Sequence, residues 1–316
     1  MRAILQTKTV LGRTPNTVFL CVNILEIRDP KMLSAAHQST NTALIAFGSN
    51  QGDSMQVFKA SIEAIRQIAG VSVVAYSRPI WTAPVTGGSI DPSSLGSPLV
   101  GDSPDDDLPY LNAVIRIETT LSPSDLHLQT SAIEHQFGRI RSGRWQARTI
   151  DLDVLLLGDH VTNTRSLTLP HPRMSFRRFV LEPAVEIAAE LMHPVAKCSI
   201  AELLRRINSP CKSMALVCPE AELESKTLDT LACELSKNNP QWKFIKIFSV
   251  DKFFQFESDL TMVALFDYQP SGDGDVLWRE LKEHALRFAG PSLRLENSPA
   301  ARGSLQELVA ALQTIG

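Results

Sequence analysis

The 316-residue sequence lacks the features of several protein classes. Its five cysteines contain no C-x-x-C pair, a pattern that fits neither a disulfide framework nor a zinc site. No apolar run approaches the roughly 18 residues that a membrane span needs. The net charge of −3 provides no overall basic field for nucleic acid. We therefore expect a cytoplasmic protein that binds neither nucleic acid nor a membrane.

The composition, 44% apolar and 21% charged, is that of a globular protein, and the length favours two domains. The first forty residues differ from the rest. Val18–Leu25 is apolar like the core of a signal peptide, but the charged stretch Glu26–Pro30 follows in place of a small-residue cleavage site. We expect residues 1–40 to be an extension, either a disordered arm or sequence upstream of a natural start at Met32.

From residue 41 onwards the pattern of apolar residues predicts a β-α-β-β-α-β order. The expected strands are Thr42–Phe47, Val71–Tyr76, Ala113–Glu118 and Ile150–Leu157, with helices over about 55–69 and from Pro123. This order is typical of an α+β ferredoxin-like plait, an antiparallel sheet with helices on one face. A polar insertion between Gly87 and Leu108 is expected to form a mobile surface loop.

A pair of carboxylates interrupts the last of these strands. Asp151 and Asp153 are separated by one residue, so both side chains project from the same face of the strand. Because neighbouring carboxylates repel each other, a partly buried pair favours a hard cation such as Mg²⁺. The alternative interpretation is the polar outer face of an edge strand.

The segment before this strand is rich in arginine. Four arginines lie between Gly138 and Arg148. Guanidinium groups bind phosphate oxygens in a bidentate manner, and a flexible loop can close onto a polyphosphate. The alternatives are a solvated basic loop or a nucleic-acid contact, although Trp145 alone offers no stacking ladder.

Two further clusters suggest ligand contacts. His171, between two prolines and near arginines, can donate to a phosphate oxygen, although a lone histidine is more often structural. Trp81–Val85 and Tyr110–Asn112 interleave small polar and apolar groups, as a pocket for a flat heteroaromatic ligand requires.

As an ordered set, these motifs resemble the 6-hydroxymethyl-7,8-dihydropterin pyrophosphokinase family over residues 42–207. The shared elements run in the family's order: Gly48-Ser49-Asn50, Thr82-x-Pro84, Tyr110-Leu111-Asn112, Gly138-Arg139-Ile140-Arg141, Arg148-Thr149-Ile150-Asp151-Leu152-Asp153, and Leu169-Pro170-His171-Pro172-Arg173-Met174. The resemblance implies an enzyme that transfers pyrophosphate from ATP to the hydroxymethyl group of the pterin and releases AMP.

The resemblance also implies the residue roles. Asp151 and Asp153 would hold two Mg²⁺ ions, and Asp153 would assist removal of the hydroxyl proton. The ATP side would comprise Arg139, Arg148, His171, Arg177, Glu134, Thr168, Arg141 and Trp145. The pterin side would comprise Thr82, Val85, Tyr110, Asn112 and Phe179, with Tyr110 and Phe179 sandwiching the ring.

Some residues depart from the family pattern. Gln146 and Ala147 stand where the family usually has glycine and proline, and this alters the loop hinge without removing a charge. Ser131 replaces a glutamine often found on the helix before Glu134. All the residues needed to bind metal and phosphate are present, so we expect an active enzyme.

Residues 208–316 carry no such motif and are predicted to form a small α/β domain of unknown function. They have neither G-x-x-x-x-G-K-[ST] nor G-x-G-x-x-G, and Phe288–Leu295 faintly resembles the end of some deoxynucleoside kinases. Two alternative functions therefore remain. In the first, the chain binds ATP or pterin without catalysing a reaction. In the second, its principal activity resides in this C-terminal domain.

Overall fold

The computed structural model describes residues 40–84, 108–138, 149–210, 212–219, 228–229, 231–233, 235–237, 239–266, 275–295 and 302–315. The predicted N-terminal extension, nearly all of the polar insertion and the arginine-rich loop lie outside these residues. Within the described ranges, no helix is long and apolar enough to cross a membrane.

The first sheet is antiparallel and has the strand order β2-β4-β1-β5. Its strands are β1 (Asn41–Ser49), β2 (Val71–Tyr76), β4 (Tyr110–Thr119) and β5 (Asp151–Leu157), and the short β3 (Ile80–Thr82) pairs with β4. The four predicted strands are confirmed, with ends shifted by up to three residues. β1 and β4 lie at the centre, and β5 is an edge strand.

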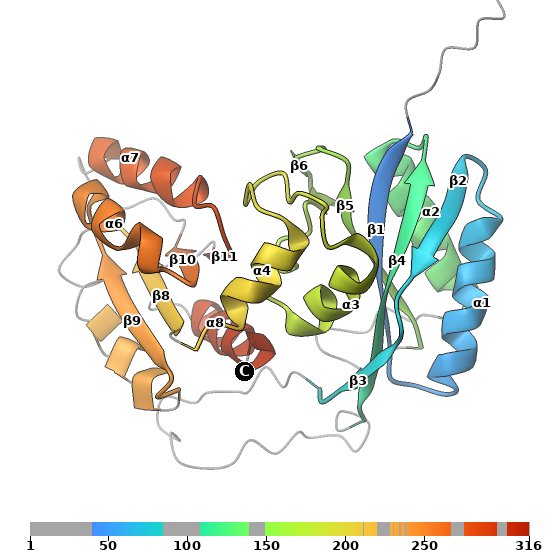
Figure 1. Cartoon of the computed structure of the whole chain (residues 1–316), viewed down its shortest axis with the longest axis horizontal. Coiled ribbons are helices and arrows are strands. Elements are labelled where there is room, and N and C mark those ends of the chain that lie inside the picture. The colour runs from blue at the N-terminus through green and yellow to red at the C-terminus, as the bar shows by residue number, and fades with distance from the viewer. Residues whose placement is uncertain are drawn as a thin grey trace, which may run out of the picture. The chain divides into compact units, whose positions relative to one another are not determined.

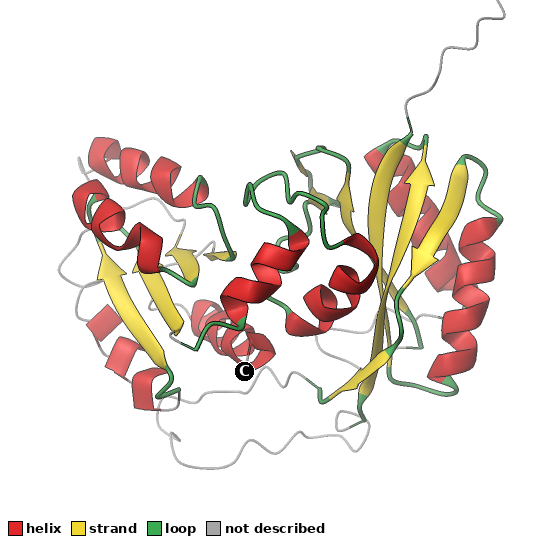
Figure 2. Ribbon diagram, in the orientation of Figure 1, coloured by secondary structure: helices red, strands yellow, loops and turns green. Residues whose placement is uncertain are grey.

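Helices α1 (Ser54–Arg66) and α2 (Pro123–Gln136) cover one face of this sheet (Figures 1 and 2). Each begins at a side-chain cap. Asp53 Oδ1 accepts a hydrogen bond from Gln56 N (3.0 Å), and Ser122 Oγ accepts one from Asp125 N (3.2 Å). Proline occupies the first position of α2, as predicted, because its fixed φ suits the start of a helix.

The expectation of helices on one face only is wrong. Helix α3 (Arg178–Ala188) packs on the opposite face and is followed by α4 (Ile200–Ile207). The physical reason is visible in β1, where the neighbours Leu44 and Ile45 are both fully buried although they point to opposite faces. Leu44 joins a cluster with α3, whereas Ile45 joins the cluster with α1 and α2.

The C-terminal residues form a second, parallel sheet with the order β11-β10-β8-β9. Its strands are β8 (Lys212–Val217), β9 (Trp242–Ile247), β10 (Met262–Phe266) and β11 (Ser292–Leu295). The accompanying helices are α6 (Val250–Phe256), the 3₁₀ helix η2 (Glu257–Asp259), α7 (Asp275–Leu286) and α8 (Arg302–Ile315). A two-stranded ribbon, β6 (Thr162–Asn163) with β7 (Thr168–Leu169), precedes α3. The apolar pattern of the C-terminal sequence also predicts a helix over Ala221–Leu235, part of which lies outside the described residues.

One hydrophobic core cluster connects α3 and α4 with the C-terminal elements. It contains Val180 and Leu181 of α3 together with Leu216 of β8 and Leu312 of α8. Buried apolar area is the main favourable term in folding. The C-terminal elements therefore share a core with α3 and with the face of the first sheet that α3 covers.

Candidate functional site

The aspartate pair lies on β5 beside the central strand β1. Asp151 pairs with Gly48 and Asp153 with Ala46, while Leu152 between them is buried in the core with α1 and α2. Both carboxylates therefore lie on the face away from that core. Because β5 is an edge strand, its position alone does not distinguish a metal site from a polar outer face. The side chains around the two aspartates distinguish these interpretations.

On one side, a cross-strand row connects Asp151 to residues expected on the pterin side. Asn112 and Asp151 both pair with Gly48, from β4 and β5 respectively. A Cβ atom on Gly48 would lie 3.7 Å from Asn112 Oδ1 and 3.8 Å from Asp151 Cβ, so this glycine separates the two polar side chains without filling the space. Buried Asn112 donates from Nδ2 to Thr82 Oγ1 (2.8 Å), and Thr82 pairs with Tyr110.

On the other side, His171 approaches Asp153. Its Nε2 lies 3.9 Å from Asp153 Oδ2, and its backbone N–H donates to Leu155 O (2.7 Å). The ring is fixed from behind, because Nδ1 accepts a hydrogen bond from Arg173 N (3.2 Å). Since Nδ1 is an acceptor, a neutral ring carries its proton on Nε2, the atom that faces the aspartates.

Burial, together with the charges of Arg177 and Arg173, lowers the pKa of His171 to about 3, against a smaller opposing effect of Asp151. The imidazole is therefore neutral near pH 7 and acts as a hydrogen-bond donor and not as a cation. The guanidinium carbon of Arg177 lies 5.4 Å from the centre of the Phe179 ring. The charge of Arg177 also acts on His171, since it is the second-largest cause of the lowered pKa of that imidazole.

Glu134 reaches the aspartate pair from helix α2. It is buried, and its Oε1 accepts a hydrogen bond from Leu152 N (2.8 Å), the backbone group between Asp151 and Asp153. Sequence reasoning missed this contact and also the spacer role of Gly48. Neither feature can be recognised in neighbouring residues of the sequence, because each involves segments that meet only in the folded sheet.

Two further predicted residues make contacts on other elements. Thr168 lies in the β6–β7 ribbon and donates to Asn163 Oδ1 (3.0 Å), and Phe179 packs against the core around α3. Five predicted residues lie outside the described part of the chain. They are Val85, Arg139, Arg141, Trp145 and Arg148.

The donor set fits a hard cation. Two carboxylates share one face, and Asp153 is 45% exposed, which leaves its oxygens accessible. In the part of the chain that the structure describes, no group of three or more His, Cys, Asp or Glu side chains forms a complete metal site. A cation held here would therefore take its remaining ligands from substrate phosphates and water, which is the usual arrangement for Mg²⁺.

Comparisons with known proteins agree on one family. The family model described as 7,8-dihydro-6-hydroxymethylpterin-pyrophosphokinase (HPPK) matches residues 44–189. The chain is 36% identical over 165 residues to the 2-amino-4-hydroxy-6-hydroxymethyldihydropteridine pyrophosphokinase of Haemophilus influenzae. These aligned residues cover 52% of this chain and 92% of the Haemophilus protein. It is 36% identical over 151 residues to the Bacillus subtilis protein of the same name, covering 48% of this chain and 80% of that one.

Among solved structures, the wild-type HPPK-DHPS of Plasmodium falciparum matches with a TM-score of 0.38 and 12% sequence identity. The match covers 79% of this chain and 60% of the Plasmodium chain. The family model and the two enzymes named above support neither of the two alternative functions, a silent binding protein or a principal activity in the C-terminal residues.

Proposed function

This chain belongs to the 7,8-dihydro-6-hydroxymethylpterin-pyrophosphokinase family. From that premise we propose which of its residues bind the metal, ATP and the pterin. The chain is a diphosphokinase that transfers a pyrophosphoryl group from ATP to hydroxymethyldihydropterin in folate synthesis. The assignment of each residue, the number of metal ions and the domain boundaries are proposals.

Asp151 and Asp153 hold Mg²⁺ in this proposal, and two ions are expected. Held there, Mg²⁺ would supply positive charge against the triphosphate. Asp153, which is partly exposed and lies beside His171, accepts the proton of the pterin hydroxyl. Glu134 keeps the backbone between the two aspartates in place through its bond to Leu152 N. Most of the catalysis is therefore positioning and electrostatics.

His171 and Arg177 bind the ATP phosphates. A neutral Nε2–H donates to a phosphate oxygen, and the guanidinium of Arg177 supplies the positive charge that a neutral imidazole lacks. Arg139 and Arg148 grip the transferred phosphates from the arginine-rich loop. Glu134, Thr168, Arg141 and Trp145 complete the nucleotide side.

The pterin lies on the Asn112 side of the aspartate pair. Asn112 and Thr82, joined by their hydrogen bond, read the polar edge of the ring together with Val85. Tyr110 and Phe179 sandwich the ring faces. Gly48 leaves space between Asn112 and Asp151, so the hydroxymethyl group can reach the metal-binding carboxylates.

We also propose how the chain is divided into domains. Residues 41–207 form the pyrophosphokinase domain, a ferredoxin-like plait supported by the antiparallel order β2-β4-β1-β5. Residues 208–316 form a small α/β domain, and residues 1–40 an extension. Cysteine usage supports a cytoplasmic location.

The observation that carries the proposal is the position of the aspartate pair between His171 and the Asn112–Thr82 pair. The test measures AMP release from Mg-ATP with and without 6-hydroxymethyl-7,8-dihydropterin. We expect pterin-dependent AMP formation that falls by about a thousandfold or more in Asp153→Asn, since metal-borne charge stabilisation is lost. Asp159→Asn, an exposed aspartate just after β5, is the control and should retain the rate. An Asp153→Asn rate near that of the wild type would refute the metal assignment.

A further inference from the structure

The segment Arg173–Arg178, which joins His171 to helix α3, is attached to the C-terminal part of the chain. The first attachment is an ion pair between Arg173 Nη2 and Glu307 Oε1 of helix α8, at 2.9 Å. The two side chains are 32% and 23% exposed. This pair is screened less than a fully exposed pair, because much of each group is removed from water.

Two further attachments follow along the same segment. Ser292 N, at the start of β11, donates to Ser175 Oγ (3.3 Å). Arg178 Nη2 donates to the carbonyl oxygen of Ile315 at the end of α8 (2.9 Å). The contacts of Arg173 and Arg178 thus involve opposite halves of α8. Arg177 lies between these two arginines in the sequence.

Apolar packing completes the attachment. Met174 and Phe176, which alternate with the attached residues, are almost fully buried in the core cluster that also contains Leu308 and Leu312 of α8. Polar contacts and apolar contacts therefore act on the same short stretch. Helix α8 therefore contributes to holding this stretch against the first sheet, whose Leu44 and Leu155 belong to the same cluster.

The segment is linked directly to the candidate site. The backbone N–H of Arg173 donates to His171 Nδ1, so the residue that pairs with Glu307 also orients the imidazole. The opposite nitrogen of that imidazole faces Asp153. A shift of Arg173 would therefore move the donor that we assign to an ATP phosphate.

We propose that Glu307 is a positioning residue for the ATP side of the site: through its ion pair with Arg173 it holds His171 and Arg177 in the geometry that binds the triphosphate. The inference rests on the proposed roles of His171 and Arg177. It also gives helix α8 a function in the pyrophosphokinase reaction. On the pterin side, Thr82, Tyr110 and Asn112 lie on β3 and β4, whereas Phe179 lies on α3, six residues after Arg173.

The test compares steady-state AMP release by the full chain and by Glu307→Gln, Arg173→Gln and the double variant. We expect each single variant to raise the KM for ATP about threefold to tenfold. The KM for the pterin and kcat should change by less than about twofold, because the aspartates, Thr82, Tyr110 and Asn112 lie on the first sheet and Phe179 is six residues from the broken ion pair. The double variant should be no worse than either single variant, since both remove one interaction.

Two controls separate positioning from a general loss of structure. Asp229→Asn removes the carboxylate of another ion pair among the C-terminal elements, that with Lys246, and should leave the KM for ATP unchanged. The charge-reversed pair Arg173→Glu with Glu307→Arg should recover part of the ATP affinity. Additive single effects, or equal increases in both KM values, would overturn the proposal.

Calorimetric titration of the full chain with Mg-ATP keeps this inference distinguishable from the assigned reaction. If the wild type binds Mg-ATP but forms no pterin-dependent AMP, the reaction assignment fails, while weaker ATP binding by Glu307→Gln still supports the positioning role. If Glu307→Gln binds Mg-ATP as tightly as the wild type does, the positioning role is wrong whatever the activity.

Discussion

Glu134 illustrates how a single buried residue supports the site. Its carboxylate is the acceptor for Leu152 N, a backbone donor buried between the two aspartates. A buried donor without a partner costs more free energy than a hydrogen bond contributes when made. Glu134 therefore serves stability and site geometry together.

Replacing Glu134 should separate these effects. Glu134→Leu removes the acceptor, and we expect it to lower the free energy of unfolding by about 1–3 kcal/mol. Glu134→Gln keeps an acceptor oxygen and should be less destabilised. Urea denaturation of both variants measures the difference. Equal stability of the two variants would show that the Leu152 hydrogen bond contributes little.

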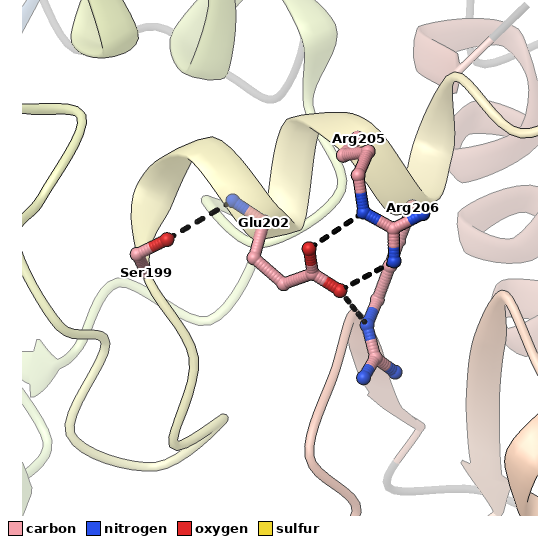
Figure 3. A network of polar contacts seen from close by, with 4 residues as sticks. All are labelled: Ser199, Glu202, Arg205 and Arg206. Carbon is pink, nitrogen blue, oxygen red and sulfur yellow. Dashed lines mark hydrogen bonds and ion pairs between the residues drawn. The ribbon is translucent and has the colours of Figure 1, made fainter.

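At the scale of elements, helix α4 shows a local network that the sequence encodes within eight residues. Ser199 Oγ accepts from Glu202 N (3.1 Å) and caps the helix, while the Glu202 carboxylate binds Arg205 and Arg206 (Figure 3). These hydrogen bonds lower the pKa of Glu202 to about 2, with Arg205 as the largest cause. The guanidinium of Arg206 also lies 5.8 Å from the centre of the Phe288 ring.

The lowered pKa of Glu202 predicts a pH dependence of stability. A carboxylate with a folded pKa near 2 and an ordinary value of 4.5 stabilises the fold fully above pH 4.5, and this contribution is lost as the pH falls towards 2. After allowance for solvent screening, we expect a contribution of about 1 kcal/mol. Unfolding measured from pH 6 to pH 2 should show a smaller decline for Glu202→Gln than for the wild type. Glu63→Gln, in the exposed pair with Arg66 on α1, is the comparison; parallel curves for the wild type and Glu202→Gln would contradict the expectation.

At the scale of the whole molecule, the continuous core implies that the two sheets resist unfolding together. Leu312 of α8 is buried in the cluster that contains Leu44 of β1 and Leu216 of β8. Truncating a side chain at the centre of such a cluster removes packing on every element that contacts it.

Leu312→Ala should therefore lower the free energy of unfolding by about 2–5 kcal/mol. Hydrogen exchange should report weaker protection of amides in β4 and in β10 to a similar extent, because both strands depend on the shared core. Leu128→Ala, at an exposed position on α2, should have little effect. Loss of protection confined to β10 would show that the two sheets unfold independently.

Several features of the fold could be predicted because they depend on short-range order. β2 has its predicted bounds, and the Ser122 cap with Pro123 lies at the start of α2 as predicted. The strands β3, β6 and β7 were missed because two or three residues carry no periodicity. Helix α3 on the second face was missed because its position is decided by contacts with β4 and α8, which are distant in the sequence.

The sequence by itself determined the family, the order of the four long strands and two helices of the first sheet, and the shared face of Asp151 and Asp153, because motifs and strand alternation are local properties. Only the tertiary structure decided that Gly48 separates Asn112 from Asp151, that Glu134 binds Leu152 N, and that Glu307 pairs with Arg173 across 134 positions. These contacts depend on strand register and on packing between distant segments. No window of neighbouring residues contains that information.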